Sequence, residues 1–152
     1  METFDRKIEI LRDAIEINNE RIAGYQKAQD IVQSENLENL YALFGDYKRQ
    51  SEQFKSELAP FITQFEETVD DGTMVSGKLF RAWMDLKSLV APSTSESVLA
   101  SCEKGEDEFK SAYKDLINES LSDFPEIVDL LQTQLSMQLG AHDHIKELRD
   151  NS

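Results

Sequence analysis

The chain has 152 residues, of which 39% are hydrophobic and 30% charged, with only 6 Gly and 3 Pro. This length and composition favour one folded helical domain, covering residues 1–152, over a disordered chain or a turn-rich β fold. The 30 Asp and Glu against 16 Lys and Arg give a formal net charge of −14, which repels phosphate backbones and anionic lipid and so argues against nucleic-acid and membrane-surface roles.

Four segments carry apolar residues at spacings of three and four, the periodicity typical of amphipathic helices. We expect these helices at about residues 4–32, 37–67, 96–118 and 125–148. Pro60 falls inside the second helix, where it is expected to produce a kink. Each of the four predicted helices therefore has one apolar face to bury.

The lengths of the connections predict the topology. Short connections near Ser34 and Ser122 make the first helix an antiparallel neighbour of the second, and the third a neighbour of the fourth. Residues 68–95 between the two hairpins form a much longer connection than is usual, which predicts an all-α, ferritin-like four-helix bundle. Apolar residues at helical spacing predict a short crossover helix at about residues 76–90, with Trp83 as its packing anchor.

Polar residues interrupt the apolar stripe near the midpoint of each predicted bundle helix. These residues, in chain order, are Asn18, Gln50, Ser51, Glu106, Gln134, Gln138 and His142. Because the midpoints of antiparallel helices share one level, the sequence predicts a polar layer inside an apolar core. Unpaired buried polar groups cost about 1–3 kcal/mol each, so we expect these side chains to bond to one another or to a bound group.

Four stretches of the sequence carry a family resemblance, at residues 18–25, 77–87, 102–113 and 142–146. The most distinctive of them is Arg-Ala-Trp-Met-Asp-Leu-Lys at residues 81–87. Together they resemble a bacterial family of four-helix-bundle proteins of unknown function in the ferritin-like superfamily. The resemblance extends over nearly the whole chain and implies the fold, whereas it implies no established activity.

The same superfamily includes rubrerythrin-like di-iron proteins, in which each hairpin supplies a Glu and a Glu-x-x-His motif. Glu106 resembles the Glu of the second hairpin, but Asn18 stands where the first would be, and Leu139 stands three residues before His142. Two divalent cations need about four carboxylates, so we expect no complete di-metal site and no cofactor. Iron or another divalent metal held by Glu106 and His142 with water remains an alternative.

Other sequence features predict a cytoplasmic protein. The first residues lack the apolar core of a signal peptide, and no apolar run approaches the ~20 residues of a membrane span. Cys102 is the only cysteine and cannot form an internal disulfide, in agreement with a reducing compartment. It lies on an apolar face and is interpreted as a core thiol rather than a nucleophile.

Three functional hypotheses remain open. The first is a non-enzymatic bundle with no catalytic residues, which acts through its surface, for example in stress physiology, alone or as a homo-oligomer such as a dimer. The second is a carboxylate metal protein with a depleted ligand set. The third is an acidic module that binds an unidentified, basic protein partner, for which the net charge of −14 is the only support.

Overall fold

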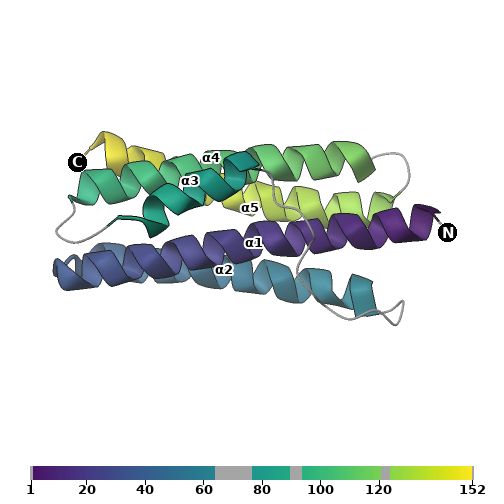
Figure 1. Ribbon diagram of the computed structural model, residues 1–152, viewed down its shortest axis with the longest axis horizontal. Helices are drawn as coiled ribbons and strands as arrows, with labels where there is room; N and C mark the ends of the chain where they lie inside the picture. Colours follow the sequence, from purple (N-terminus) through teal and green to yellow (C-terminus); the bar gives the residue numbers. More distant parts are fainter. Residues whose placement is uncertain (1, 64–76, 90–93, 121–123, 152) are drawn as a thin grey trace.

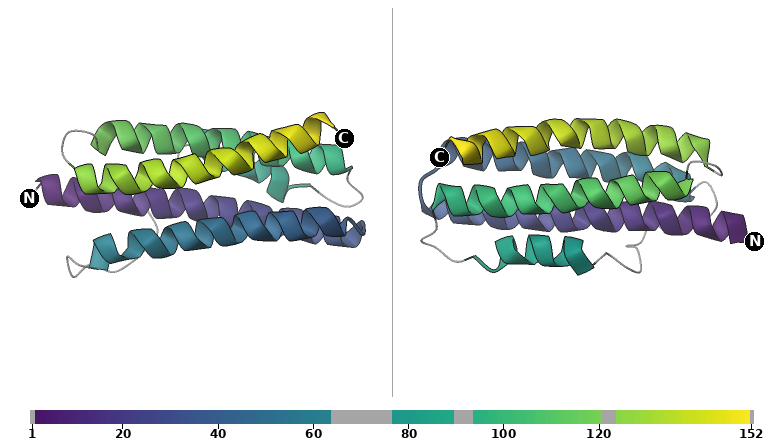
Figure 2. Two further views of the ribbon diagram at one scale, coloured as in Figure 1. Left: turned by 180° about the vertical axis from the view of Figure 1, so that it is seen from behind. Right: turned by 90° about the horizontal axis from the view of Figure 1, so that it is seen from above.

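The computed structural model describes residues 2–63, 77–89, 94–120 and 124–151, and within these ranges the chain is helical, without a β-strand. The helices are α1 (Glu2–Ser34), α2 (Glu38–Thr63), α3 (Gly77–Lys87), α4 (Ser95–Ser120) and α5 (Pro125–Asp150). The prediction of an all-helical protein is confirmed. Four long helices lie lengthwise beside one another, and the short α3 lies outside α1 and α4 (Figures 1 and 2).

A tight turn joins α1 to α2, which pack against each other (Figure 1). Asn36 takes a left-handed conformation with φ of 61°, which asparagine tolerates better than most residues. The Leu37 amide donates to the Val32 carbonyl at 2.9 Å and satisfies an acceptor that the end of α1 would leave open. The end predicted for the second helix, near residue 67, lies outside the described residues.

Side-chain and proline signals define where α4 and α5 begin. The Ser97 amide donates to the Thr94 hydroxyl at 3.0 Å, so Thr94 caps α4. Pro125 occupies the first turn of α5, where its missing N–H costs nothing. The buried Phe124 precedes it and anchors this end of the helix in the core.

The crossover helix α3 packs against α1 and α4 (Figure 2). It begins and ends close to the predicted limits, with residue 90 outside the described residues. Trp83 is fully buried between Gly24 of α1 and Gly105 of α4. A Cβ atom at Gly24 would lie 2.2 Å from Trp83 Cε3, and one at Gly105 would lie 2.6 Å from the ring. Only glycine leaves room for the indole at these two positions.

The core is continuous along the bundle. It contains apolar residues from all four long helices, among them Leu11, Ile15, Phe54, Phe109 and Leu131, all buried. None of the helices in the described ranges has a stretch long and apolar enough to span a bilayer.

Candidate functional site: a buried ion pair and its polar network

The centre of the bundle contains an ion pair between Arg21 of α1 and Glu106 of α4. Both side chains are completely buried. Arg21 Nε donates to Glu106 Oε1 and Nη2 donates to Oε2, each at 2.8 Å, which is the bidentate geometry of a strong charge-assisted pair. Arg21 Nη1 also donates to the Ser51 hydroxyl of α2 at 3.0 Å. The one buried carboxylate of the predicted polar layer is therefore neutralised by a guanidinium.

Sequence reasoning missed Arg21, although its position gave a signal. Arg21 follows Asn18 by three residues and precedes Tyr25 by four, so the three side chains share one face of α1. A long basic side chain on such a face is usually interpreted as reaching into solvent. The opposite helix decides the outcome, because Glu106 gives the guanidinium a partner inside the core.

Aromatic rings surround the guanidinium. Its Cζ atom lies 5.2 Å from the centroid of the Phe109 ring, 5.5 Å from Tyr25 and 5.9 Å from Tyr47, within reach of cation–π attraction. Burial alone would lower the pKa of Arg21, but the Glu106 carboxylate outweighs it and the pKa is raised. The arginine therefore stays charged at every physiological pH.

A chain of hydrogen bonds begins at Asn18, one helical turn from Arg21 on α1, and runs across the other long helices. Asn18 Nδ2 donates to the Tyr113 hydroxyl at 2.8 Å, which donates to Gln134 Oε1 at 2.7 Å. Gln134 Nε2 in turn donates to the Phe54 carbonyl at 3.1 Å and to Glu57 Oε1 at 3.0 Å. Asn18, Tyr113 and Gln134 are all fully buried. These contacts connect α1, α4, α5 and α2 in that order.

The remaining glutamines differ in burial. Gln138 is fully buried and its Nε2 donates to the Glu106 carbonyl at 3.0 Å. Gln50 is only partly buried and its Nε2 reaches the Met137 carbonyl at 3.5 Å. We use the name buried network for the fully buried side chains that these hydrogen bonds join, which are Asn18, Arg21, Ser51, Glu106, Tyr113, Gln134 and Gln138.

Two acceptors of the buried network, Asn18 Oδ1 and Gln138 Oε1, have no hydrogen-bond donor within the described ranges. A water molecule would satisfy such acceptors. A second cation placed beside them would be repelled by the Arg21 guanidinium. These two acceptor oxygens therefore suit a neutral hydrogen-bond donor better than a metal ion.

His142 lies at the α4–α5 contact and is 7% exposed. Its Nε2 faces Asp107 Oδ1 at 2.5 Å and its Nδ1 faces Asp143 Oδ1 at 3.0 Å. Burial alone would lower the pKa of His142, but the hydrogen bonds with Asp143 and Asp107 raise it above the ordinary value of 6.5. Both ring nitrogens are thus engaged by carboxylates at the rim of the bundle.

The two residues considered for a single metal, Glu106 and His142, have different partners. Both Glu106 oxygens accept from Arg21, and both His142 nitrogens face aspartates. In the part of the chain that the structure describes, no group of three His, Cys, Asp or Glu side chains is arranged to hold a metal ion. A metal at Glu106 would have to displace the guanidinium.

Other reactive side chains near the network are held protonated. Burial, and then the charge of Glu106, raises the pKa of the Cys102 thiol well above its ordinary value of 9.0, so the nucleophilic thiolate is disfavoured. The same two causes raise the pKa of Tyr47 to about 12. Neither side chain is prepared for nucleophilic or acid–base chemistry near neutral pH.

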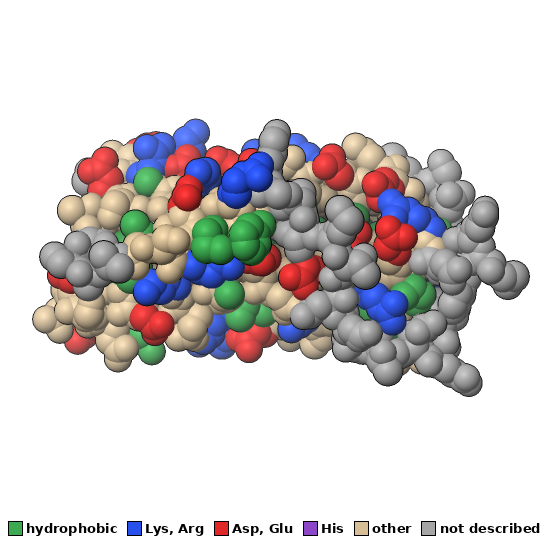
Figure 3. Space-filling view, in the orientation of Figure 1, with side chains coloured by type: hydrophobic (Ala, Val, Ile, Leu, Met, Phe, Trp, Pro, Cys, Tyr) green, Lys and Arg blue, Asp and Glu red, His purple; other side chains and the backbone are tan. Residues whose placement is uncertain are grey.

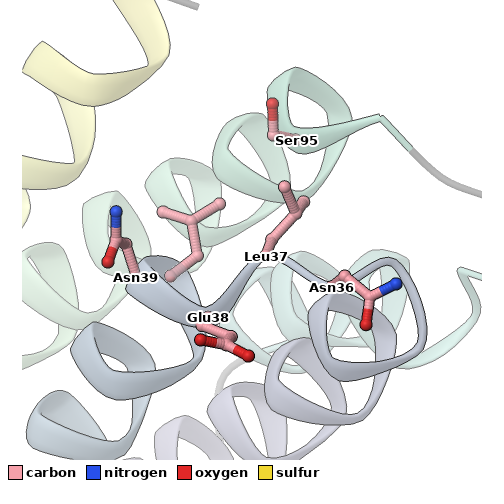
Figure 4. Close-up of a pocket in the computed structure, with 6 residues that line it drawn as sticks. Asn36, Leu37, Glu38, Asn39 and Ser95 are labelled. Carbon is pink, nitrogen blue, oxygen red and sulfur yellow. The ribbon is translucent and has the colours of Figure 1, made fainter.

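A separate pocket of about 450 Å³ lies at the end of the bundle where the α1–α2 turn approaches the start of α4 (Figure 4). Its labelled lining residues are Asn36, Leu37, Glu38, Asn39 and Ser95. Among the lining residues that the structure describes, Glu38 is the one ionisable group.

The fold and this site define an all-helical bundle with a paired arginine and glutamate at its centre. Residues 6–119 match the family described as Domain of unknown function (DUF2383), and the chain belongs to this family. The matched region includes Asn18, Arg21, Ser51, Glu106 and Tyr113, and ends before α5. No curated protein matches the chain.

Proposed function

We propose that this protein is a non-enzymatic bundle of ferritin-like topology that acts through its surface. The packing of α1 with α2 and of α4 with α5, with α3 in the long connection between the pairs, supports this topology. The position that carries metal-binding carboxylates in the di-metal members of that fold class is filled here by the buried network. The function therefore differs from oxidase or ferroxidase chemistry.

The bidentate contact between Arg21 and Glu106 carries this proposal. Di-metal bundles leave their inward carboxylates free to neutralise two divalent cations. Here both oxygens of Glu106 are used by one side chain, and both partners are fully buried. The guanidinium supplies the positive charge that a metal would otherwise bring. The network is thus complete in charge without an inorganic ion.

The test is metal content, measured by plasma mass spectrometry on protein purified without chelator and then challenged with ferrous iron. We expect no stoichiometric metal and no iron-dependent oxygen uptake. Glu106→Gln should leave metal content unchanged and lower stability, because it leaves a buried guanidinium without its counter-ion. Asp115→Asn, an exposed position on the same helix, serves as the matched control for loss of one carboxylate.

Binding of about one or two equivalents of metal per chain that Glu106→Gln abolishes, while Asp115→Asn retains it, would contradict the proposal. Such a result would identify the depleted ligand set of Glu106 and His142 as a working metal site. An oxygen-consumption assay of the iron-loaded protein would then separate metal storage from catalysis.

A further inference from the structure

Helix α3 has one buried side and one exposed side. Ala82, Trp83 and Leu86 are completely buried against α1 and α4. On the opposite side, Phe80 is 43% exposed and Met84 37% exposed. Arg81 and Asp85 are exposed beside them. We call Phe80, Arg81, Met84 and Asp85 together the α3 outer face.

The α3 outer face lies on an open part of the surface. Figure 3 shows hydrophobic side chains grouped near the middle of this view, with Lys and Arg side chains beside them, where Figure 1 places α3. A pocket of about 360 Å³ adjoins it, lined by Arg81, Met84, Asp85, Lys104 and Glu108. Two carboxylates, Asp85 and Glu108, thus stand next to the apolar stripe.

The basic side chains around this face differ in whether they form ion pairs. Lys87 pairs with Glu20 at 2.7 Å while lying 5.4 Å from the Phe80 ring centroid, and Lys104 pairs with Asp85. Arg81 has no ion pair among the residues that the structure describes. The face therefore offers one spare guanidinium beside an apolar pair and a pocket with two carboxylates.

Helical geometry makes this face complementary to itself. Successive residues turn by about 100°, so Phe80 and Met84 form one stripe and Arg81 and Asp85 form a second, about 100° further round. Consider two antiparallel copies of α3 related by a two-fold axis that is perpendicular both to the helices and to the line that joins them. This axis places each stripe opposite the same stripe of the other copy. Phe80 then meets Met84 of the other copy, and Arg81 meets Asp85, twice each.

We propose that the α3 outer face is an isologous dimer interface, occupied by a second copy of this chain with its α3 antiparallel. Isologous contacts require that residue i meets j and j meets i, and both stripes satisfy this. The guanidinium of each copy would enter the pocket of the other, toward Asp85 and Glu108. The inference deepens the proposed function by naming the surface and the partner.

The test uses charge reversal on the intact protein. Sedimentation velocity over a range of concentrations, at about 0.15 M salt to screen the net repulsion between copies, should show a reversible monomer–dimer equilibrium. Arg81→Glu and Asp85→Lys each turn two attractive contacts per dimer into repulsive ones, so each should weaken dimerisation about tenfold or more. Both positions are exposed, so far-UV circular dichroism should show both variants folded.

Mixing the two variants is the decisive measurement. A heterodimer of Arg81→Glu with Asp85→Lys regains both opposite-charge pairs, whereas neither homodimer does. Native mass spectrometry of one variant labelled with ¹⁵N and mixed with the other unlabelled should therefore show mainly the mixed dimer, with near wild-type affinity. Met137→Asn, which changes a 51% exposed residue on α5, should leave the affinity unchanged.

Wild-type protein that stays monomeric at all concentrations would overturn the proposal, and so would a dimer that neither charge reversal weakens. Absence of the mixed dimer would overturn the antiparallel pairing. An acidic peptide as the true occupant would give a different pattern, since Arg81→Glu would abolish its binding and Asp85→Lys would strengthen it. None of these results depends on metal content, so failure here leaves the metal test unaffected.

Discussion

Arg21 places a positive charge inside the protein core. A buried guanidinium is costly unless its donors and its charge are matched. Here two donors meet Glu106, one meets Ser51, and three aromatic rings surround the charge. The pair therefore fixes which groups must lie opposite one another, and we expect the loss of one partner to destabilise the fold more than the loss of both.

Replacement of Arg21 by Met should lower the free energy of unfolding by about 3–5 kcal/mol, because it leaves the Glu106 carboxylate buried without a partner. The double variant Arg21→Met/Glu106→Leu should lie within about 1–2 kcal/mol of wild type, because no charge remains buried. Urea denaturation followed by circular dichroism measures both. A double variant no more stable than the single one would show that the pair contributes more than charge matching.

The matched control is Arg49→Met on α2. Arg49 is 66% exposed in its side chain and pairs with Asp46 at 2.5 Å. An exposed ion pair is worth little, so this substitution should change stability by about 0.5 kcal/mol or less. A comparable loss at both arginines would mean that the effect at Arg21 reflects lost helix propensity rather than burial.

His142 gives a prediction in pH. Its folded-state pKa is raised above 6.5 by Asp143 and Asp107, so the protonated form is favoured in the folded protein. The stability it contributes is fully present below pH 6.5 and is lost as pH rises through the raised pKa. The stability difference between wild type and His142→Gln should therefore be greatest in mild acid and shrink toward pH 8.

Asp107→Asn should reduce this pH dependence, because it removes one of the two carboxylates that favour the imidazolium. Thermal unfolding at a series of pH values between about 5 and 8 measures the difference. A difference that grows with pH instead would mean that His142 is bound as the neutral imidazole in the folded protein.

At the scale of elements, Trp83 holds α3 to the bundle by shape. Its indole lies between Gly24 and Gly105 and meets Tyr25 edge-on at 5.5 Å between ring centroids. The Trp83 Nε1–H has no acceptor within the described part of the chain. Trp83 therefore contributes to the docking of the crossover helix through packing against two glycines and an aromatic ring.

Gly24→Ala should displace the indole, since the new Cβ would lie 2.2 Å from Trp83 Cε3. We expect a net loss of about 1–3 kcal/mol from overpacking. Trp83 is the only tryptophan, so a red shift of intrinsic fluorescence reports its exposure directly. A variant with unchanged emission and stability would mean that α3 shifts as a unit without losing its contacts.

Gly140→Ala is the matched control for this substitution. Gly140 lies within α5, and a Cβ there meets nothing within 4 Å. The change should stabilise the protein by up to about 1 kcal/mol through helix propensity, with unchanged tryptophan emission. The opposite signs expected at the two glycines separate steric contact with Trp83 from the general preference of helices for alanine.

At the scale of the whole molecule, α1 is the helix that packs against α2, α3 and α4. The Arg21–Glu106 pair lies where α1 meets α4, and so connects the α1–α2 pair to the α4–α5 pair. Surface ion pairs such as Lys7 with Glu126 and Arg6 with Glu119 repeat this connection at the N-terminal end of α1. The buried network therefore specifies how the two pairs of helices meet.

The helical fold could be predicted from the sequence because its causes are local. Spacings of three and four fix each amphipathic face, and Asn36 and Pro125 mark where helices end or begin. The predicted start of α5 coincides with the observed one, and the other predicted limits of α1, α3, α4 and α5 differ from the observed ones by one to three residues, at ends where helices fray. Glycines 24 and 105 gave no such local signal, because their role depends on an indole from a distant segment.

The sequence by itself determined that this protein is an acidic all-helical chain, with polar residues such as Asn18 and Glu106 interrupting its apolar stripes. Only the tertiary structure decided that Arg21 lies inside, because whether a long cation is solvated or buried depends on what the opposite helix offers. Glu106 lies 85 residues away in the chain, and no local pattern connects the two. The charge balance of the core, in which the Arg21 guanidinium neutralises the Glu106 carboxylate, is therefore a property of the assembled helices.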